Sequence, residues 1–144
     1  ARLMVSRTGS NQFSKRLRLR KEKFKGASER MLKDAATAAL RVMATNTPVD
    51  TSRALSNWLV TRDGPSRDYI EAHTPGERGS TASMSLADTL ALGRAEIEMF
   101  DMSRDADLFI TNNTPYLRYN NGSTLTLLGQ QAAKSALVGA KLFS

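Results

Sequence analysis

Cysteine is absent from the 144 residues of the chain. Without thiols, the sequence excludes disulfides, a thiolate nucleophile and any zinc or iron-sulfur site held by cysteine. No stretch approaches the ~18 consecutive apolar residues that a membrane span requires, and the first residues lack the apolar core of a signal peptide. We therefore expect a protein of a reducing compartment, cytosolic or part of a particle built there, with no membrane partner.

Histidine occurs once, as His73. The nearby Asp68, Glu71 and Glu77 suggest a metal site or a general base, but their spacing fits no recognised metal motif. An exposed loop histidine is the preferred interpretation. The sequence also lacks the Gly-x-Ser-x-Gly, Gly-x-x-x-x-Gly-Lys and Gly-x-Gly-x-x-Gly patterns of hydrolases and nucleotide-binding proteins. We expect no enzymatic activity, no cofactor and no bound metal.

The densest group of carboxylates is Asp101, Asp105 and Asp107. A carboxylate-only, metal-dependent nuclease is the alternative that this group leaves open. These residues lie where a solvated connection between a helix and a strand is expected, which favours a structural interpretation.

Glycine and proline are scarce, at nine and four residues, and 40% of the chain is apolar. These values are typical of a folded chain rather than a disordered or fibrous one. A chain of this length can bury roughly 70% of its unfolded surface in a single core. The sequence therefore predicts one globular domain.

Positive charge is concentrated at the N-terminus. Residues 1–25 contain nine basic residues and one acidic residue, whereas residues 26–144 contain 12 basic and 13 acidic residues. This excess of positive charge predicts that residues 1–25 contact an acidic protein surface or DNA. The affinity for DNA would fall steeply as the salt concentration rises. The candidate contact residues are Lys15, Arg16, Arg18, Arg20, Lys21, Lys23 and Lys25. A small basic nucleic-acid-binding protein is the alternative, although no interleaved aromatic residues or helix-turn-helix pattern accompany the charge.

Helical periodicity predicts one long helix over residues 14–45, stopped by Pro48. Residues 1–25 would then form a basic arm and the start of this helix, and residues 26–144 a single domain. Further helices are expected over residues 85–100 and 129–143, with a short helical turn within residues 50–56, where Asp50 or Thr51 could serve as the N-cap.

Strands are predicted over residues 57–62, 68–72, 107–111 and 124–128, the first two joined as a hairpin by the turn at residues 63–66. The expected fold class is α+β: a small sheet of three or four mostly antiparallel strands packed by a long N-terminal helix, a middle helix and a C-terminal helix. Residues 73–83 are expected to be a loop that carries contacts.

Two segments resemble a known family. Residues 47–58 read TPVDTSRALSNW and residues 110–123 read ITNNTPYLRYNNGS. In this order and spacing they resemble the tail-completion and neck proteins of tailed bacteriophages, including those named minor tail protein Z. That family typically shows T-P-V-D-T-G-x-L before a tryptophan, then I-x-N-x-x-P-Y and a nearby glycine. The matching positions are Pro48, Asp50, Thr51, Trp58, Asn112, Pro115, Tyr116 and Gly122.

The resemblance implies a structural virion protein, assembled in the host cytoplasm, that joins the head connector to the tail. It implies a homo-oligomeric ring, usually sixfold, with the genomic DNA passing through its lumen, and such a ring needs a heterologous interface that closes. Two positions depart from the pattern: Ser52 stands where glycine is usual, and Asn120 and Asn121 replace an acidic residue. The matched residues are expected to define turns rather than to perform chemistry.

Overall fold

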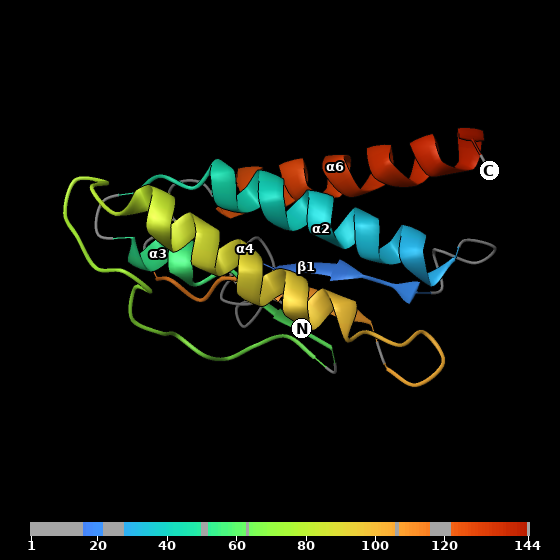
Figure 1. Ribbon diagram of the computed structural model, residues 1–144, viewed down its shortest axis with the longest axis horizontal. Helices are drawn as coiled ribbons and strands as arrows, with labels where there is room; N and C mark the ends of the chain where they lie inside the picture. The colour runs from blue at the N-terminus through green and yellow to red at the C-terminus, as the bar shows by residue number, and fades with distance from the viewer. Residues whose placement is uncertain are drawn as a thin grey trace, which may run out of the picture.

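The computed structural model describes residues 16–21, 28–49, 52–62, 64–105, 107–115 and 122–143 (Figure 1). The elements in chain order are β1 (Arg16–Leu19), α2 (Glu29–Thr45), α3 (Arg53–Ser56), β2 (Leu59–Thr61), α4 (Ala82–Glu98), β3 (Leu108–Thr111) and α6 (Gly122–Phe143). Together they form a small α+β fold, which confirms the fold class expected from the sequence.

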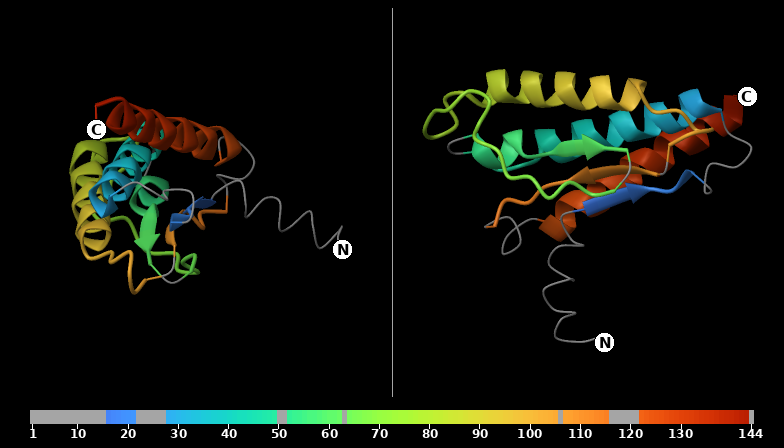
Figure 2. Two further views of the ribbon diagram at one scale, coloured as in Figure 1. Left: turned by 90° about the vertical axis from the view of Figure 1, so that its right-hand side faces the viewer. Right: turned by 90° about the horizontal axis from the view of Figure 1, so that it is seen from below.

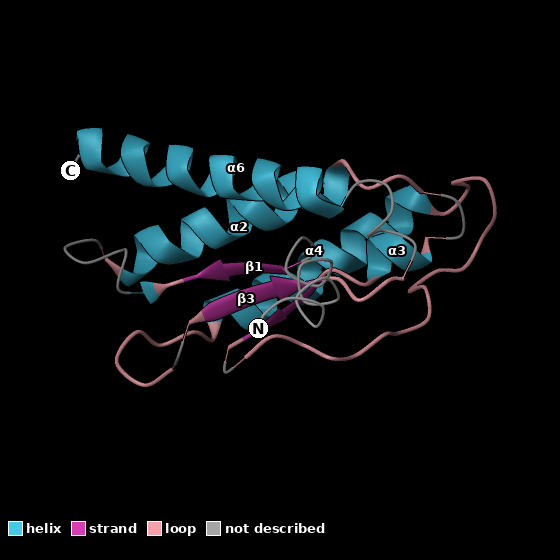
Figure 3. Cartoon of the chain, turned by 180° about the vertical axis from the view of Figure 1, so that it is seen from behind, coloured by secondary structure: helices cyan, strands magenta, loops and turns pink. Residues whose placement is uncertain are grey.

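The strands form one antiparallel sheet in the order β1-β3-β2. The long helices cover one face of this sheet, with α2 lying between α4 and α6 (Figures 1 and 2). Figure 3, which views the molecule from behind, shows β1 and β3 side by side. The first described strand is therefore an edge of the sheet, and the strand nearest the C-terminus is its centre.

The register divides the sheet into a core face and an outer face. Leu17, Ile110 and Val60 lie opposite one another across the three strands, and all three side chains are buried. Since directly paired residues share a face, the neighbouring row of Arg18, Phe109 and Thr61 points to the other side. The helix layer packs on the leucine side, where Trp58, Phe100, Leu32, Leu40, Met43 and Leu108 are almost wholly buried.

The prediction of one helix over residues 14–45 is wrong in its first half. Residues 16–19 form β1, and α2 begins only after Ser28, whose hydroxyl accepts a hydrogen bond from the Met31 amide at 3.2 Å. The Arg-Leu-Arg-Leu alternation explains the strand, because alternate residues point to opposite faces and both leucines enter the core. A strand of the sheet thus lies inside the segment predicted to be a basic arm and the start of a helix.

Two predicted strands are also wrong. Residues 68–72 do not join the sheet; Ile70 is held instead by the Asn57 side chain, which accepts from its N–H at 2.8 Å and donates to its carbonyl at 2.9 Å. Residues 124–128 belong to α6, which starts at Gly122 rather than at Gly129. Leu125 and Ala133 lie on one side of this helix and are buried, so helical spacing prevails over the local β propensity.

The other elements agree with prediction. The expected strands at residues 57–62 and 107–111 are β2 and β3, the expected middle helix is α4, and the expected helical turn is α3. Among the described residues, no helix has both the length and the apolarity that crossing a membrane requires.

Candidate partner-contact surface

Arginines of the first strand gather beside the outer face of the sheet. Arg16, Arg18 and Arg20 line an open hollow of about 770 Å³, which is completed by Gly64, Pro65, Phe109 and Gln130. The alternation of β1 explains why these three side chains lie together, because residues two apart in a strand share a face. The sequence identified the arginines, but not the residues from the distant β3 and α6.

Arg18 is held by its own chain. Its guanidinium donates to Asp107 Oδ2 at 2.7–2.8 Å and lies 5.6 Å from the centre of the Phe109 ring. Asp107 is largely covered, whereas half of the Arg18 side chain is exposed. The ion pair therefore orients Arg18 at the edge of the hollow and neutralises part of its charge.

Arg16 lies in a cationic environment. Burial, and second the positive charge of Arg18, lower the pKa of Arg16. The lowered pKa therefore reports mainly the partial burial of the Arg16 guanidinium and only second its closeness to Arg18. Because arginine stays protonated at any physiological pH, the shift leaves its positive charge in place.

Lys21 is used inside the molecule. Its ammonium donates to the backbone carbonyls of Met102 and Asp105, and its backbone N–H donates to Asp107 Oδ1 at 2.9 Å. It therefore fastens the end of β1 to the loop after α4. Lys15, Lys23 and Lys25, also expected to contact a partner, lie outside the described residues.

The two family-like segments meet in the interior. Asn112, which is fully buried, donates through Nδ2 to the carbonyl of Ala54 at 2.8 Å and accepts from the Thr114 amide at 3.0 Å. Within the first segment, Trp58 Nε1 donates to Thr47 Oγ1 at 2.7 Å. Segments separated by about fifty residues thus form one buried polar junction between α3 and the end of β3.

Ser52 has a left-handed backbone, with φ at 72°. It is buried, and its hydroxyl lies 2.8 Å from Thr81 Oγ1. Left-handed angles favour glycine, because it lacks the Cβ that makes them costly. The position where the family pattern has glycine is therefore one where the backbone geometry favours it.

The remaining motif positions are exposed, at the start of a helix or undescribed. Pro48 and Pro115 are exposed, and Gly122 is the first residue of α6. Asp50, Thr51 and Tyr116 lie outside the described residues, and so do Asn120 and Asn121.

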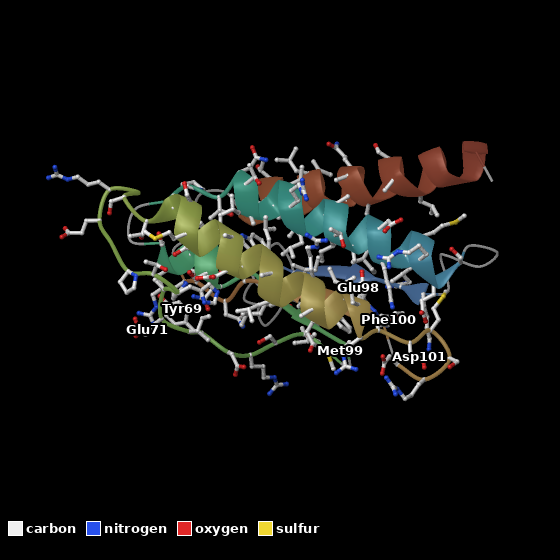
Figure 4. The ribbon with its side chains drawn as sticks, in the orientation of Figure 1. Tyr69, Glu71, Glu98, Met99, Phe100 and Asp101 are labelled. Atoms are coloured by element: carbon white, nitrogen blue, oxygen red, sulfur yellow. The ribbon has the colours of Figure 1, made fainter. Side chains whose placement is uncertain are left out.

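The loop after β2 is pinned to α3. The Arg53 guanidinium lies 3.8 Å from the centre of the Tyr69 ring and 3.4 Å from Glu71, and Figure 4 shows Tyr69 and Glu71 on this loop, at the far end of α4 from Asp101. The His73 amide donates to Ser56 Oγ at 2.9 Å. The loop is thus attached to the framework by specific contacts.

The acidic residues considered as catalytic make structural contacts. Asp105 accepts from the Asp101 amide at 2.8 Å, and Asp101 accepts from the amide and hydroxyl of Ser103. These bonds lower the pKa of both carboxyl groups. Within the described ranges, no three histidine or acidic residues are grouped so as to hold a metal ion.

Comparisons with known proteins found no match: no family model, no curated protein and no solved structure corresponds to this chain.

Proposed function

We propose that the chain is a structural virion protein of a tailed bacteriophage, a ring-forming neck or tail-completion subunit that joins the head connector to the tail. The observation that carries this proposal is the buried junction of the two family-like segments through Asn112 and Ala54. Residues that a family pattern pairs across a long stretch of sequence are expected to touch. The left-handed Ser52, at the glycine position of the pattern, adds independent support.

The surface of α4 supplies a contact for a neighbouring subunit. Met84 and Leu92 lie along this helix and Met99 is its C-cap; their side chains are 52%, 60% and 55% exposed. Large apolar side chains gathered on one exposed helix favour a protein interface. A closed ring requires this surface to meet a different surface of the next copy.

The mass of the purified chain tests the proposal. We expect native mass spectrometry to show a single closed oligomer, in the sixfold range that the resemblance implies, and we expect Leu92→Glu to convert it to smaller species. Gln131→Glu, at an exposed position of α6, is the matched control and should leave the oligomer intact. A wild-type chain that stays monomeric at all concentrations, alone and with isolated phage connectors, would contradict the proposal.

The second candidate is a small basic nucleic-acid-binding protein, favoured by the convergence of Arg16, Arg18 and Arg20 on one hollow. Each phosphate contact contributes a slope of about −0.9 to the logarithmic dependence of duplex affinity on salt. Titrating labelled duplex DNA at several salt concentrations distinguishes the candidates. A slope of −3 or steeper, reduced by Arg16→Gln, would favour the nucleic-acid binder over the assembly protein.

A further inference from the structure

A second groove follows the outer edge of β1. It has a volume of about 490 Å³ and runs between β1 and α6. Its lining residues are Leu17, Arg18, Leu19, Arg20, Gln130, Ala133, Lys134 and Leu137. This groove lies beside the cationic hollow and shares Arg18, Arg20 and Gln130 with it.

The residues that line the groove show that it runs along the backbone of β1. Four consecutive residues, 17–20, contribute to it, although the side chains of neighbouring strand residues point to opposite faces. Only a groove that follows the strand edge meets all four. In the described sheet β1 pairs with β3 alone, so at every second strand residue the backbone N–H and C=O groups point away from β3, at the edge that the groove follows.

The chemistry of the groove is apolar with a positive rim. Far more of its lining surface is apolar than polar, and Leu17, Leu19, Ala133 and Leu137 are the apolar residues among its lining. Arg18, Arg20 and Lys134 are the charged residues among its lining, and all three are cations. An occupant therefore needs apolar side chains, negative charge and a backbone able to pair with a strand.

We propose that this groove binds an extended segment of a partner protein, with acidic and apolar residues alternating, as an additional strand on β1. Main-chain hydrogen bonds supply affinity in such strand addition, and pockets for alternate side chains supply specificity. Four paired residues at about 3.3 Å each span roughly 13 Å. The inference rests on the proposed assembly role only in taking the partner to be another structural protein.

The lining favours a peptide over nucleic acid. Single-stranded nucleic acid is bound through aromatic platforms on which bases stack, and this groove has none among its lining residues. Its apolar side chains have no counterpart on a sugar-phosphate backbone, whereas they match the apolar residues of an extended peptide.

A labelled synthetic peptide tests the proposal with the full chain. The probe is a fluorescein-tagged peptide of about ten residues that alternates glutamate and valine, titrated by anisotropy at about 0.15 M salt, where a Debye length of about 8 Å limits long-range attraction. We expect saturable binding that Lys134→Glu weakens about fivefold. When the peptide is bound, hydrogen exchange should become slower at the amides of β1 that point away from β3, and should stay unchanged at the alternate amides that face β3.

Matched controls distinguish binding at the edge of β1 from nonspecific attraction between opposite charges. Arg94→Glu makes the same change of charge at an exposed position of α4, outside the groove, and should leave the affinity within about twofold. A peptide with proline at alternate positions loses its donors and should not bind. A lysine-valine peptide should not bind either.

Three results would overturn the inference: no binding of the glutamate-valine peptide, equal effects of Lys134→Glu and Arg94→Glu, or preferential binding of an oligothymidylate of similar length. The assembly role has its own readout. A chain that forms a closed ring but ignores the peptide refutes the strand-addition site alone, whereas a chain that binds the peptide but stays monomeric with and without phage connectors refutes the ring.

Discussion

Ser52 combines an unfavourable backbone angle with a favourable side-chain contact. Its left-handed conformation costs about 1–2 kcal/mol for a residue that carries a Cβ, while its hydroxyl bonds to Thr81 within a buried site. Such a bond contributes about 0.5–1.5 kcal/mol. The two effects are of similar size, so serine is tolerated at a position suited to glycine.

Two substitutions separate these effects. Ser52→Ala removes the hydrogen bond and keeps the Cβ, and it should lower the free energy of unfolding by about 1 kcal/mol. Ser52→Gly removes the bond and the Cβ together, so the glycine variant should be about 1 kcal/mol more stable than the alanine variant. Urea unfolding followed by circular dichroism measures both. Equal stabilities would show that the backbone of Ser52 is not strained.

Two glycines within helices, Gly93 and Gly129, differ in how well their surroundings would accept a Cβ. A Cβ on Gly93 of α4 would collide with Leu40 Cδ2 and lie 3.2 Å from Val60 Cγ2, whereas a Cβ on Gly129 of α6 would meet only the side chain of Met43, with its sulfur at 2.7 Å. Leu40 is wholly buried and has little space in which to move. Methionine, which is unbranched and flexible, adapts more easily.

Substituting alanine at these two glycines should therefore change the free energy of unfolding by different amounts. Alanine is favoured over glycine in a helix by up to about 1 kcal/mol, and overpacking a core costs about 1–3 kcal/mol. We expect Gly93→Ala to lower the unfolding free energy by 1–2 kcal/mol and Gly129→Ala to change it by less than about 0.5 kcal/mol. Denaturant titration of both variants provides the measurement; a stabilised Gly93→Ala variant would contradict the packing of α4 on α2.

Among the secondary-structure elements, β1 anchors part of the basic segment of residues 1–25 in the core. Leu17 and Leu19 are each only 4% exposed, and losing a buried leucine side chain costs about 2–5 kcal/mol. A domain has only about 5–15 kcal/mol of stability in total. Removal of the strand would consume most of it.

Two truncations test this role of β1. A chain that starts at residue 15 keeps the strand and should unfold cooperatively, with a midpoint near that of the full chain. A chain that starts at residue 26 lacks both leucines and should lose cooperative thermal unfolding by calorimetry. If both truncated chains fold alike, β1 is not part of the core. Because the chain that starts at residue 26 is expected to unfold, its loss of particle assembly would not identify a lost contact. The truncation at residue 15 is therefore the informative one for partner contact.

The misassigned strand shows what the sequence could and could not reveal. The Arg16–Leu19 alternation is a strand signal of period two, but it covers only four residues and is followed by a longer helical pattern, so the charge of the segment dominated its interpretation. The helices α2 and α4 and the strands β2 and β3 were predictable, because their periodicity and flanking turns agree. In α6, local β propensity at Thr124 and Thr126 concealed a helical stripe that packs on α2.

The candidate site was predictable only in part. The arginines of β1 were evident from their charge, whereas Phe109, Gln130 and Lys134 join them only through the tertiary fold. No local pattern marks an exposed glutamine or lysine on α6 as a groove residue. The contact of Asn112 with Ala54 likewise depends on sheet topology, which the sequence alone did not determine.

For the molecule as a whole, three carboxyl groups make the stability of the fold depend on pH. Hydrogen bonding to Arg30 lowers the pKa of Glu98, bonds from Ser103 lower that of Asp101, and the backbone N–H of Asp101 lowers that of Asp105. A carboxyl group whose pKa is lower in the folded than in the unfolded chain stabilises the fold above its unfolded pKa. That contribution is lost as the pH falls through the folded pKa.

We therefore expect the urea midpoint to be steady near neutral pH and to fall between about pH 5 and pH 2. Asp105→Asn should make this fall shallower, because one linked proton is removed. Asp88→Asn, at an exposed position of α4, should leave the slope as it is. Chemical denaturation at a series of pH values measures the effect, and identical slopes for the Asp105 variant and the wild type would contradict it.

The pairing of β1 with β3 also has a consequence during synthesis. Arg18 and Asp107, which form an ion pair across these strands, are 89 residues apart. At translation rates of about 5–20 residues per second, the first strand waits roughly 4–18 s before its partner is made. Throughout that delay Leu17 and Leu19 are uncovered, and the interleaved arginines keep nascent chains apart by mutual repulsion. We therefore expect the charge of this strand to limit aggregation of the unfinished polypeptide on the ribosome.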